Sequence, residues 1–255
     1  MAGYIFMFSA RKQRYHDRNM NTFRQQISIV LPVLNEAGNI IPLLEGIHQQ
    51  LKGSRFEAIV VDDGSNDGTS GVVHEYQIKH PWVKLMHHSQ PKDLGESIKM
   101  GVQSAQGDII VGMDADGNHD PVTLPSLIAT LDSADIAIGS RFVSGGGMQN
   151  RFRFGLTLAF NLFLRIWYGF PIWDNTSGYY AIKRTTLTKL PLDDIYHGYG
   201  EYHLRLVYIL SRKKAVLKEI PVYYRDRLYG QSKSVFRTMV KTYLRVAREL
   251  QAQYS

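Results

Sequence analysis

Apolar and polar positions change character in regular blocks from residue 27 onward. Short apolar runs rich in β-branched residues, typical of strands buried on both faces, alternate with segments of helical spacing. Strands are predicted over 27–31 (closed by Pro32), 57–61, 82–88, 107–116 and 134–142, and helices over 39–51, 70–79, 94–104 and 121–131. Strands that alternate with helices predict βαβ units, and therefore an α/β fold with a mostly parallel sheet flanked by helices.

The pattern changes after about Gly147. An apolar helix is predicted over 155–170, and strands are predicted within 174–184 and 215–227. The last segment has apolar residues at helical spacing and Lys or Arg at other positions, which predicts a basic amphipathic helix. We therefore divide the chain into three parts: a basic N-terminal extension (1–26), a central α/β domain (27–234) and a C-terminal amphipathic helix (235–255).

Composition narrows the class of protein. The 255 residues, 44% of them hydrophobic, suffice for one large α/β domain or two small ones. The chain has no cysteine, which excludes disulfides, thiolate nucleophiles and zinc–thiolate sites. The sequence contains no run of about 18 uncharged apolar residues, so no transmembrane helix is predicted. The nearest candidate, 155–173, contains Arg165. An apolar patch precedes basic residues at the N-terminus, which is the reverse of a signal peptide.

Charge is unevenly distributed along the chain. Residues 1–26 carry 5 Lys/Arg and 1 Asp, residues 27–150 carry 7 Lys/Arg and 15 Asp/Glu, and residues 151–255 carry 18 Lys/Arg and 7 Asp/Glu. The acidic middle part would repel a nucleic-acid backbone, so no nucleic-acid partner is predicted. The asymmetry suggests a cation site in the middle part and an anionic partner for the basic part, although a chance distribution of surface charge is the simpler alternative.

Three polar loops follow predicted strands, over 32–39, 62–69 and 114–120. In open parallel sheets, ligands bind beyond the carboxyl ends of the strands, where these loops lie. The glycine motifs G-x-G-x-x-G and G-x-x-x-x-G-K-[ST], which bind phosphates through the backbone, are absent. A phosphate bound at this edge therefore has to be neutralised in another way.

The third loop suits a divalent cation. Asp114 and Asp116 point to the same side if the strand geometry continues, and Asn118 offers a further carbonyl oxygen. Oxygen ligands favour Mg²⁺ or Mn²⁺, which keep coordination sites for substrate phosphates. The alternatives are a solvated Asp/Gly/Asn loop here and an Asx-turn cluster that caps a helix at 62–69, and the loops alone leave these open.

Four segments carry a resemblance to a known family: LPVLNE, VVDDGSNDGT, GDIIVGMDADGNHDP and GSRFVSGG, in this order and at these spacings. Together they resemble glycosyltransferase family 2, which has the Rossmann-like GT-A fold. DNTSGYYAIKR followed by DRLYGQSK resembles the polyprenyl-phosphate members, above all the dolichyl-phosphate mannosyltransferases. The resemblance covers about residues 27–235. It implies a metal-dependent, inverting transfer of a sugar, mannose from GDP-mannose, to polyprenyl (dolichyl) phosphate.

The resemblance is less specific for the substrates than for the family. The alternative is a family 2 enzyme that uses UDP-glucose or a related donor, or a non-lipid glycan acceptor. A non-catalytic module that binds a nucleotide sugar or a lipid phosphate is a third interpretation. The intact acidic and basic motifs, with Asp114, Asp116, Arg227 and Lys233, argue against that one.

Roles for individual residues follow from the resemblance. It places the nucleotide sugar against residues of the three loops: Pro32, Asn35, Glu36, Asp62, Asp63, Asp114, Ala115 and Asp116. It places Mg²⁺ or Mn²⁺ at the DxD motif, on Asp114, Asp116 and Asn118, where relatives often have Gln in place of Asn118.

The same resemblance assigns the cations. Arg141 matches an arginine near the acceptor phosphate, with Arg153 as a weaker candidate. Arg227, Ser232 and Lys233 match a basic R-x-x-G-x-S-K loop that is expected to close over the diphosphate and the acceptor phosphate. The residues expected to act in catalysis are therefore Asp116, Arg141, Arg227 and Lys233.

A general base is less necessary for a phosphate nucleophile than for a sugar hydroxyl. The second pKa of a phosphate monoester is about 6, so the nucleophile is largely ionised at neutral pH. His119, His197 and His203 are candidate bases, but a lone histidine is more often structural. Glu201 has no assigned role.

A polyprenyl phosphate lies in a bilayer, so we expect a cytoplasmic protein peripherally associated with the cytoplasmic face of a membrane. Two segments are candidates for contact with the surface, 155–170 and the basic helix over 235–250. Lys and Arg opposite an apolar face suit anionic lipid headgroups. The alternative is that both helices simply pack on the sheet, and for the C-terminal helix we weigh the two interpretations equally. A membrane-anchoring partner protein is a third possibility.

Overall fold

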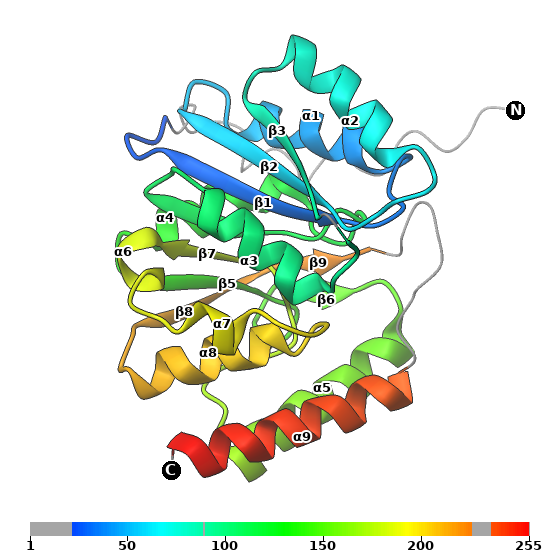
Figure 1. The fold of residues 1–255 in the computed structure, drawn as a ribbon. Coiled ribbons are helices and arrows are strands. Elements are labelled where there is room, and N and C mark those ends of the chain that lie inside the picture. The colour runs from blue at the N-terminus through cyan, green and yellow to red at the C-terminus, as the bar shows by residue number, and fades with distance from the viewer. Residues whose placement is uncertain (1–21, 89, 226–235, 255) are drawn as a thin grey trace, which may run out of the picture.

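The computed structural model describes residues 22–88, 90–225 and 236–254 (for 236–238 the backbone). In this part of the chain a seven-stranded sheet lies between two layers of helices (Figure 1). Its strands are β1 (Ile27–Val33), β2 (Phe56–Asp62), β3 (Val83–His87), β4 (Ile109–Gly112), β5 (Ile136–Ser140), β7 (Tyr180–Lys183) and β8 (Leu217–Pro221). The predicted α/β fold is therefore confirmed.

The strand order explains where ligands can bind. The order is β3-β2-β1-β4-β7-β5-β8, and all neighbours are parallel except β7, which runs antiparallel to both β4 and β5. Two further strands, β6 (Gly147–Met148) and β9 (Tyr223–Tyr224), pair with each other. The chain reverses its winding between β1 and β4, and such a switch point leaves a crevice beyond the carboxyl ends of the strands.

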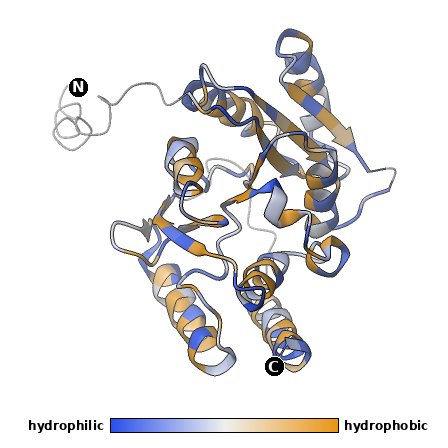
Figure 2. Cartoon of the chain, turned by 90° about the vertical axis from the view of Figure 1, so that its left-hand side faces the viewer, coloured by the Kyte–Doolittle hydropathy of each residue, from blue (hydrophilic) through white to orange (hydrophobic). Residues whose placement is uncertain are grey.

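Ten helical segments cover the sheet within the described residues: α1 (Ile40–Gln50), α2 (Thr69–Lys79), α3 (Leu94–Ser104), the 3₁₀ turn η2 (Pro121–Thr123), α4 (Leu124–Thr130), α5 (Arg151–Tyr168), α6 (Arg184–Leu187), α7 (Leu192–Ile195), α8 (Tyr202–Arg212) and α9 (Phe236–Tyr254). Side chains of a strand alternate between the two faces of the sheet. Ile27, Ile29 and Leu31 accordingly pack with α1 and α4, whereas Val30 packs in the cluster that contains α3, α8 and α9. Figure 2 shows the strands largely in the hydrophobic colour, as expected for a sheet covered on both faces.

Several boundaries differ from the predictions: β4 ends at Gly112 rather than at 116, and α5 begins at Arg151 rather than at 155. The first strand does not close at Pro32: it continues to Val33, and Pro32 pairs in register with Val61. A proline near a strand end removes at most one ladder hydrogen bond, so the strand tolerates it. The predicted helix over 121–131 begins as a 3₁₀ turn, and the predicted last strand divides into β8 and β9.

The C-terminal helix is part of the core. Tyr243, Val246, Ala247 and Leu250 of α9 are buried in the same cluster as α8. In Figure 1, α9 and α5 run side by side along the lower edge of the molecule. The apolar side of α9 is therefore packed against the protein, and its exposed positions carry the basic residues Lys241, Arg245 and Arg248. Among the described residues, no helix has both the length and the apolar character needed to cross a membrane.

Candidate active site

A cavity of about 410 Å³ lies beyond the carboxyl ends of β1, β2 and β4. The loops after these strands form one wall, and the first turn of α3 adds to it through Asp93 and Leu94. Arg153 of α5 and Tyr243 of α9 also line the cavity. The cavity therefore joins the acidic middle part of the chain to the basic last part.

The first two loops contribute to this cavity unequally. Pro32, Glu36 and Asp63 line it, whereas Asn35 and Asp62 are absent from its walls. Asp63 Oδ1 accepts a hydrogen bond from the backbone N–H of Lys92 at 2.7 Å, which ties the loop after β3 to the cavity rim. Of the two consecutive acids, only Asp63 is thus placed to meet a ligand directly.

Asn35 and Asp62 support the loops from behind. Asp62 is 1% exposed, and its Oδ1 accepts hydrogen bonds from Ser65 N–H (2.9 Å) and Ser65 Oγ–H (2.6 Å). Asn35 adopts a positive φ of 57°, and its Oδ1 accepts a hydrogen bond from the backbone N–H of Asn66 at 2.9 Å. This Asx-type bonding between neighbouring loops fixes their shape, so the turn interpretation and the binding interpretation of the second loop both apply.

The acidic loop faces the cavity with all the residues expected of it: Asp114, Ala115, Asp116 and Asn118. Asn118 donates its backbone N–H to Asp116 Oδ1 (3.0 Å) and its Nδ2–H to Asp116 Oδ2 (2.8 Å). Asp116 is 6% exposed, so these bonds hold a nearly buried carboxylate in one orientation. They also orient the Asn118 amide, whose nitrogen is engaged and whose oxygen remains the available metal donor.

This donor set fits a hard divalent cation. No cluster of three or more His, Asp or Glu side chains suited to a metal occurs among the described residues. The acidic loop instead offers two carboxylates and one amide oxygen, and each carboxylate oxygen accepts more than one partner. Mg²⁺ and Mn²⁺ bind in this way when substrate phosphates complete the coordination. Asp114, Asp116 and Asn118 are thus the residues that would hold the ion.

Arg141 lies at the cavity but its charge is already paired. Its Nε and one terminal nitrogen donate to the two carboxylate oxygens of Asp174 at 2.7 and 2.6 Å, and the same terminal nitrogen donates to Thr176 Oγ1 at 2.9 Å. The guanidinium also lies 4.7 Å from the centroid of the Tyr224 ring. Burial alone would lower the pKa of Arg141, but the Asp174 carboxylate outweighs it and raises that pKa. Arg141 is a fixed, oriented donor rather than a mobile cation.

Three further cations line the cavity. Arg153 does so as expected, and the sequence analysis did not single out Lys92 or Arg225. Arg225 lies 3.8 Å from Asp120. Arg225 lies two residues before Arg227, the first residue of the basic motif, and this proximity could have identified it from the sequence. Arg227, Ser232 and Lys233 lie outside the described residues, so their predicted roles stay predictions.

The candidate bases do not face the cavity. The imidazole of His119 is buried, with Nδ1 and Nε2 both hydrogen-bonded within the protein. His203 is buried as well, its ring nitrogens have no partner among the described residues, and burial lowers its pKa to about 4. His197 is exposed and is not among the cavity-lining residues. Glu201 is 6% exposed and accepts a hydrogen bond from Tyr199 N–H at 3.1 Å, which shapes the loop that carries Tyr199 and Gly200 to the cavity.

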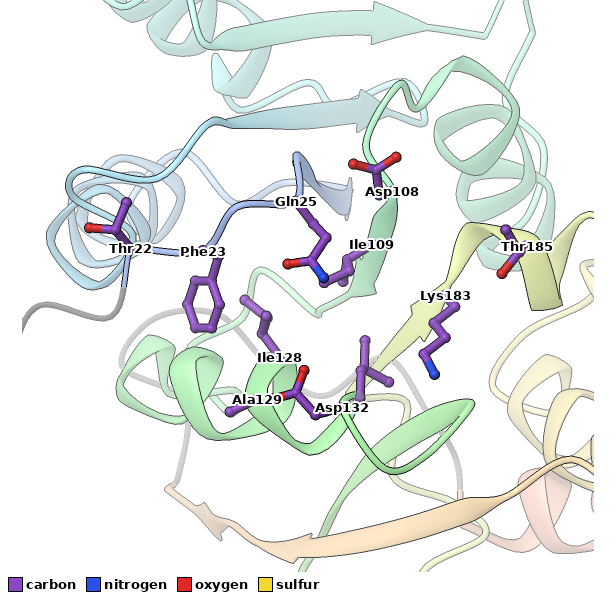
Figure 3. A pocket seen from close by; sticks show the side chains of 11 residues that line it. Thr22, Phe23, Gln25, Asp108, Ile109, Ile128, Ala129, Asp132, Lys183 and Thr185 are labelled. Carbon is purple, nitrogen blue, oxygen red and sulfur yellow. The ribbon is translucent and has the colours of Figure 1, made fainter.

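A second cavity of similar size lies at the opposite edge of the sheet (Figure 3). Its walls include Asp108 and Ile109 at the start of β4, Lys183 at the end of β7, and Ile128 of α4. None of the predicted site residues lines it. The predicted site residues that line a cavity in the described part of the chain therefore all line the first one.

The family model described as glycosyl transferase family 2 matches residues 28–190, which include the three loops and Arg141. The chain belongs to glycosyltransferase family 2. It is therefore a glycosyltransferase, and the expectation drawn from the sequence motifs is confirmed at the level of the family.

Proteins whose names refer to polyprenol or dolichol phosphates are among the similar proteins. The chain is 32% identical over 215 residues to an undecaprenyl-phosphate mannosyltransferase of Micrococcus luteus, covering 82% of this chain and 87% of that protein. It is 33% identical over 217 residues to a polyprenol monophosphomannose synthase of Mycolicibacterium smegmatis, covering 82% and 81%. A dolichol-phosphate mannosyltransferase of Pyrococcus furiosus is 30% identical over 86% of this chain, which spans only 62% of that relative's length.

A similar fold is also found among solved structures. Glucosyl-3-phosphoglycerate synthase from Mycobacterium tuberculosis, in complex with Mn²⁺, UDP and phosphoglyceric acid, superposes with a TM-score of 0.69. The two chains are 22% identical, and the match covers 89% of this chain and 79% of that one. At this identity the likeness concerns the fold, which is thereby confirmed as that of the GT-A neighbours.

Proposed function

We propose that this protein transfers mannose from GDP-mannose to a polyprenyl phosphate, with inversion at the anomeric carbon and with Mg²⁺ or Mn²⁺ bound at the acidic loop. The observation that carries the proposal is the composition of one cavity. The carboxylates of Asp114 and Asp116 line the same cavity as the cationic side chains of Arg153, Arg225 and Lys92. A diphosphate donor and a phosphate acceptor need both kinds of group within one site.

The residues divide the work between the two substrates. Asp63 and Glu36 line the part of the cavity beyond β1 and β2, where the nucleoside is expected by the switch-point geometry. Asp114, Asp116 and Asn118 hold the cation, and a bound divalent cation supplies charge neutralisation for the leaving diphosphate. Lys233 of the basic motif is proposed to add a second positive charge there.

The acceptor half needs orientation more than proton transfer. A polyprenyl phosphate is already largely ionised at neutral pH, because its second pKa is about 6. No histidine among the described residues lines the cavity, which agrees with a reaction that uses no dedicated base. Arg141, Arg153 and Arg227 are proposed to hold the doubly charged nucleophile in line with the anomeric carbon, and such positioning supplies much of the rate in reactions of this kind.

Peripheral binding to the cytoplasmic face of a membrane is the second part of the proposal. Phe152, Ile166 and Trp167 of α5 are 78, 66 and 67% exposed. With Leu156 and Phe163 they form one stripe along the helix, while Leu164 and Tyr168 face the core. Aromatic and aliphatic side chains beside basic residues suit the interface of an anionic bilayer. The stripe shares its helix with the cavity residue Arg153, so a bilayer bound to the stripe would lie next to the proposed acceptor site.

Vesicle co-sedimentation tests the membrane part. Phe152→Ser combined with Trp167→Ser removes two large apolar side chains, each worth about 1.5–3 kcal/mol when buried, so binding to vesicles with anionic lipid is expected to fall at least 100-fold. Ile78→Ser on α2 is the matched control, because Ile78 is 72% exposed but isolated from the stripe. Equal vesicle binding by the double variant and the control would show that α5 does not bind the membrane. The next experiment would then ask whether a membrane-anchoring partner protein is required.

A panel of donors tests the reaction. Purified protein is given radiolabelled GDP-mannose, UDP-glucose or UDP-N-acetylglucosamine, with a polyprenyl phosphate in detergent. The proposal expects label in the lipid phase from GDP-mannose alone. Label in the lipid phase from a UDP-sugar would show that the proposed acceptor is right and the proposed donor is wrong. Release of nucleotide only when a soluble glycan is added would show that the proposed acceptor is wrong.

A further inference from the structure

A buried chain of hydrogen bonds runs beneath the acidic loop. The backbone N–H of Asp114 donates to His119 Nδ1 at 2.8 Å, and His119 Nε2 lies 2.7 Å from Tyr224 Oη. Tyr224 Oη–H donates to the backbone oxygen of Ser177 at 2.8 Å. Ser177 Oγ–H in turn donates to the backbone oxygen of Gly139. Four separate segments of the site, the ends of β4 and β5, the loop before β7 and strand β9, thus meet in one network.

The direction of both hydrogen bonds of His119 is determined. A backbone N–H can only donate, so His119 Nδ1 must be the acceptor and the ring proton of the neutral imidazole must sit on Nε2. Nε2–H therefore donates to Tyr224 Oη, and the Tyr224 proton is left for Ser177. The His119 ring also stacks on Tyr179, with centroids 4.7 Å apart and planes at 12°, so it cannot turn without losing both contacts.

Burial makes the network costly to break. His119 is 1% exposed, Ser177 is 5% exposed and Tyr224 is 7% exposed. A buried polar group that loses its hydrogen-bond partner is left desolvated and unpaired, which is unfavourable in free energy. The network is therefore expected to keep one arrangement. The two segments it joins most directly are the acidic loop and β9, and the residue after β9, Arg225, faces the cavity.

We propose that His119 and Tyr224 are positioning residues, which hold the acidic loop against β9 so that Asp114 and Asp116 present their carboxylates to the divalent cation. This inference rests on the proposed metal-dependent function. Neither residue is assigned to proton transfer, because both ring nitrogens of His119 are engaged inside the protein. Groups behind the ligands of a metal site typically change metal affinity 10- to 100-fold when removed.

The test is Mn²⁺ binding in the presence of GDP, followed by the electron paramagnetic resonance signal of free Mn²⁺. Tyr224→Phe removes only the Oη atom, and we expect the dissociation constant for Mn²⁺ to rise at least 10-fold while GDP binding without metal changes less than twofold. Tyr196→Phe is the control for loss of a buried tyrosine hydroxyl: Tyr196 Oη lies in a 2.9 Å bond to Tyr180 Oη, and Tyr196, unlike Tyr224, does not line the cavity. It removes the same atom at a similar cost to folding, so its Mn²⁺ affinity is expected to stay within twofold of wild type.

A second variant guards against general damage. His119→Asn keeps an acceptor near the Nδ1 position but loses the donor to Tyr224, so it should weaken Mn²⁺ binding to the same extent as Tyr224→Phe. The double variant should be no weaker than either single one if both act through one link. Mn²⁺ affinity within twofold of wild type in Tyr224→Phe would overturn this inference alone. Absence of Mn²⁺ binding by the wild-type protein, with GDP or UDP, would overturn the proposed metal role together with it.

Discussion

Removal of the Asp174 carboxylate should destabilise the protein strongly, because it leaves the buried Arg141 charge unpaired. Asp174 is fully buried and accepts hydrogen bonds from the Arg141 backbone N–H (2.9 Å), Nε (2.7 Å) and a terminal nitrogen (2.6 Å). Its own backbone N–H donates to Glu219 at 2.9 Å, which fixes the carboxylate in place. Asp174→Ala would leave a guanidinium that is 5% exposed without its counter-ion.

The expected cost is large relative to the stability of a domain. Removing one partner of a buried ion pair costs about 3–5 kcal/mol, because the remaining charge stays desolvated. A native domain is stable by only about 5–15 kcal/mol, so a fifth or more of that free energy is at risk. The same reasoning predicts that Arg141→Met combined with Asp174→Leu, which removes both charges, recovers most of the stability while still abolishing transfer.

Urea unfolding followed by circular dichroism measures the cost. Asp193→Ala serves as the control, because Asp193 is 87% exposed in its ion pair with Lys99 and should contribute less than about 1 kcal/mol. A free energy of unfolding for Asp174→Ala within 1 kcal/mol of wild type would refute the reasoning. So would a double variant that is less stable than Asp174→Ala alone, since the unpaired charge would then not be the cause.

Three further predictions concern other parts of the molecule. Burial holds the pKa of His203 at about 4 against an ordinary 6.5. The stability that depends on neutral His203 should therefore be fully present above pH 6.5 and should be lost, by up to about 3 kcal/mol, as the pH falls through 4. His203→Leu should make the urea midpoint of unfolding less dependent on pH across this window, and an unchanged pH dependence would contradict the assignment. A Cβ on Gly95 would lie 2.5 Å from the backbone nitrogen of His197, so Gly95→Ala should destabilise the protein by about 1–3 kcal/mol in thermal unfolding, whereas Gly155→Ala, with nothing within 4 Å, should be neutral or stabilising; equal melting temperatures would show that the loop yields. Arg153→Gln should raise KM for polyprenyl phosphate about tenfold and leave KM for the sugar donor unchanged, since loss of one charge-assisted bond costs roughly 1.5 kcal/mol; a change confined to the donor would move Arg153 to the other half of the site.

The sequence predicted the parts of the site that depend on strand ends. Apolar runs locate buried strands well, and polar loops follow their carboxyl ends, which is why Asp63, Asp114 and Asp116 line one cavity. The direction of β7 could not be predicted in this way, because a short apolar run has the same pattern in parallel and antiparallel strands. The helical period of the last segment was also recognised, but periodicity alone does not tell whether an apolar face meets a sheet or a lipid.

Contacts between distant loops account for what the sequence did not show. Asp62 and Asp63 look equivalent in the sequence, yet Asp62 braces Ser65 while Asp63 lines the cavity. The difference arises from the alternation of side chains at the end of β2, where a shift by one residue exchanges the two faces. The partnership of Arg141 with Asp174, 33 residues apart, likewise depends on the tertiary fold.

The most direct test of the account is the metal dependence of lipid-linked product formation. Transfer from radiolabelled GDP-mannose to polyprenyl phosphate is measured with wild-type protein and with Asp116→Ala, over a titration of Mn²⁺ and with EDTA. The account predicts label in the lipid phase for the wild-type protein only when metal is present, and a loss of at least 100-fold in Asp116→Ala at unchanged circular dichroism, as expected when a group that stabilises the leaving diphosphate is removed. Full activity of Asp116→Ala, or undiminished lipid labelling in EDTA, would contradict the central claim that this cavity acts through a metal-bound diphosphate.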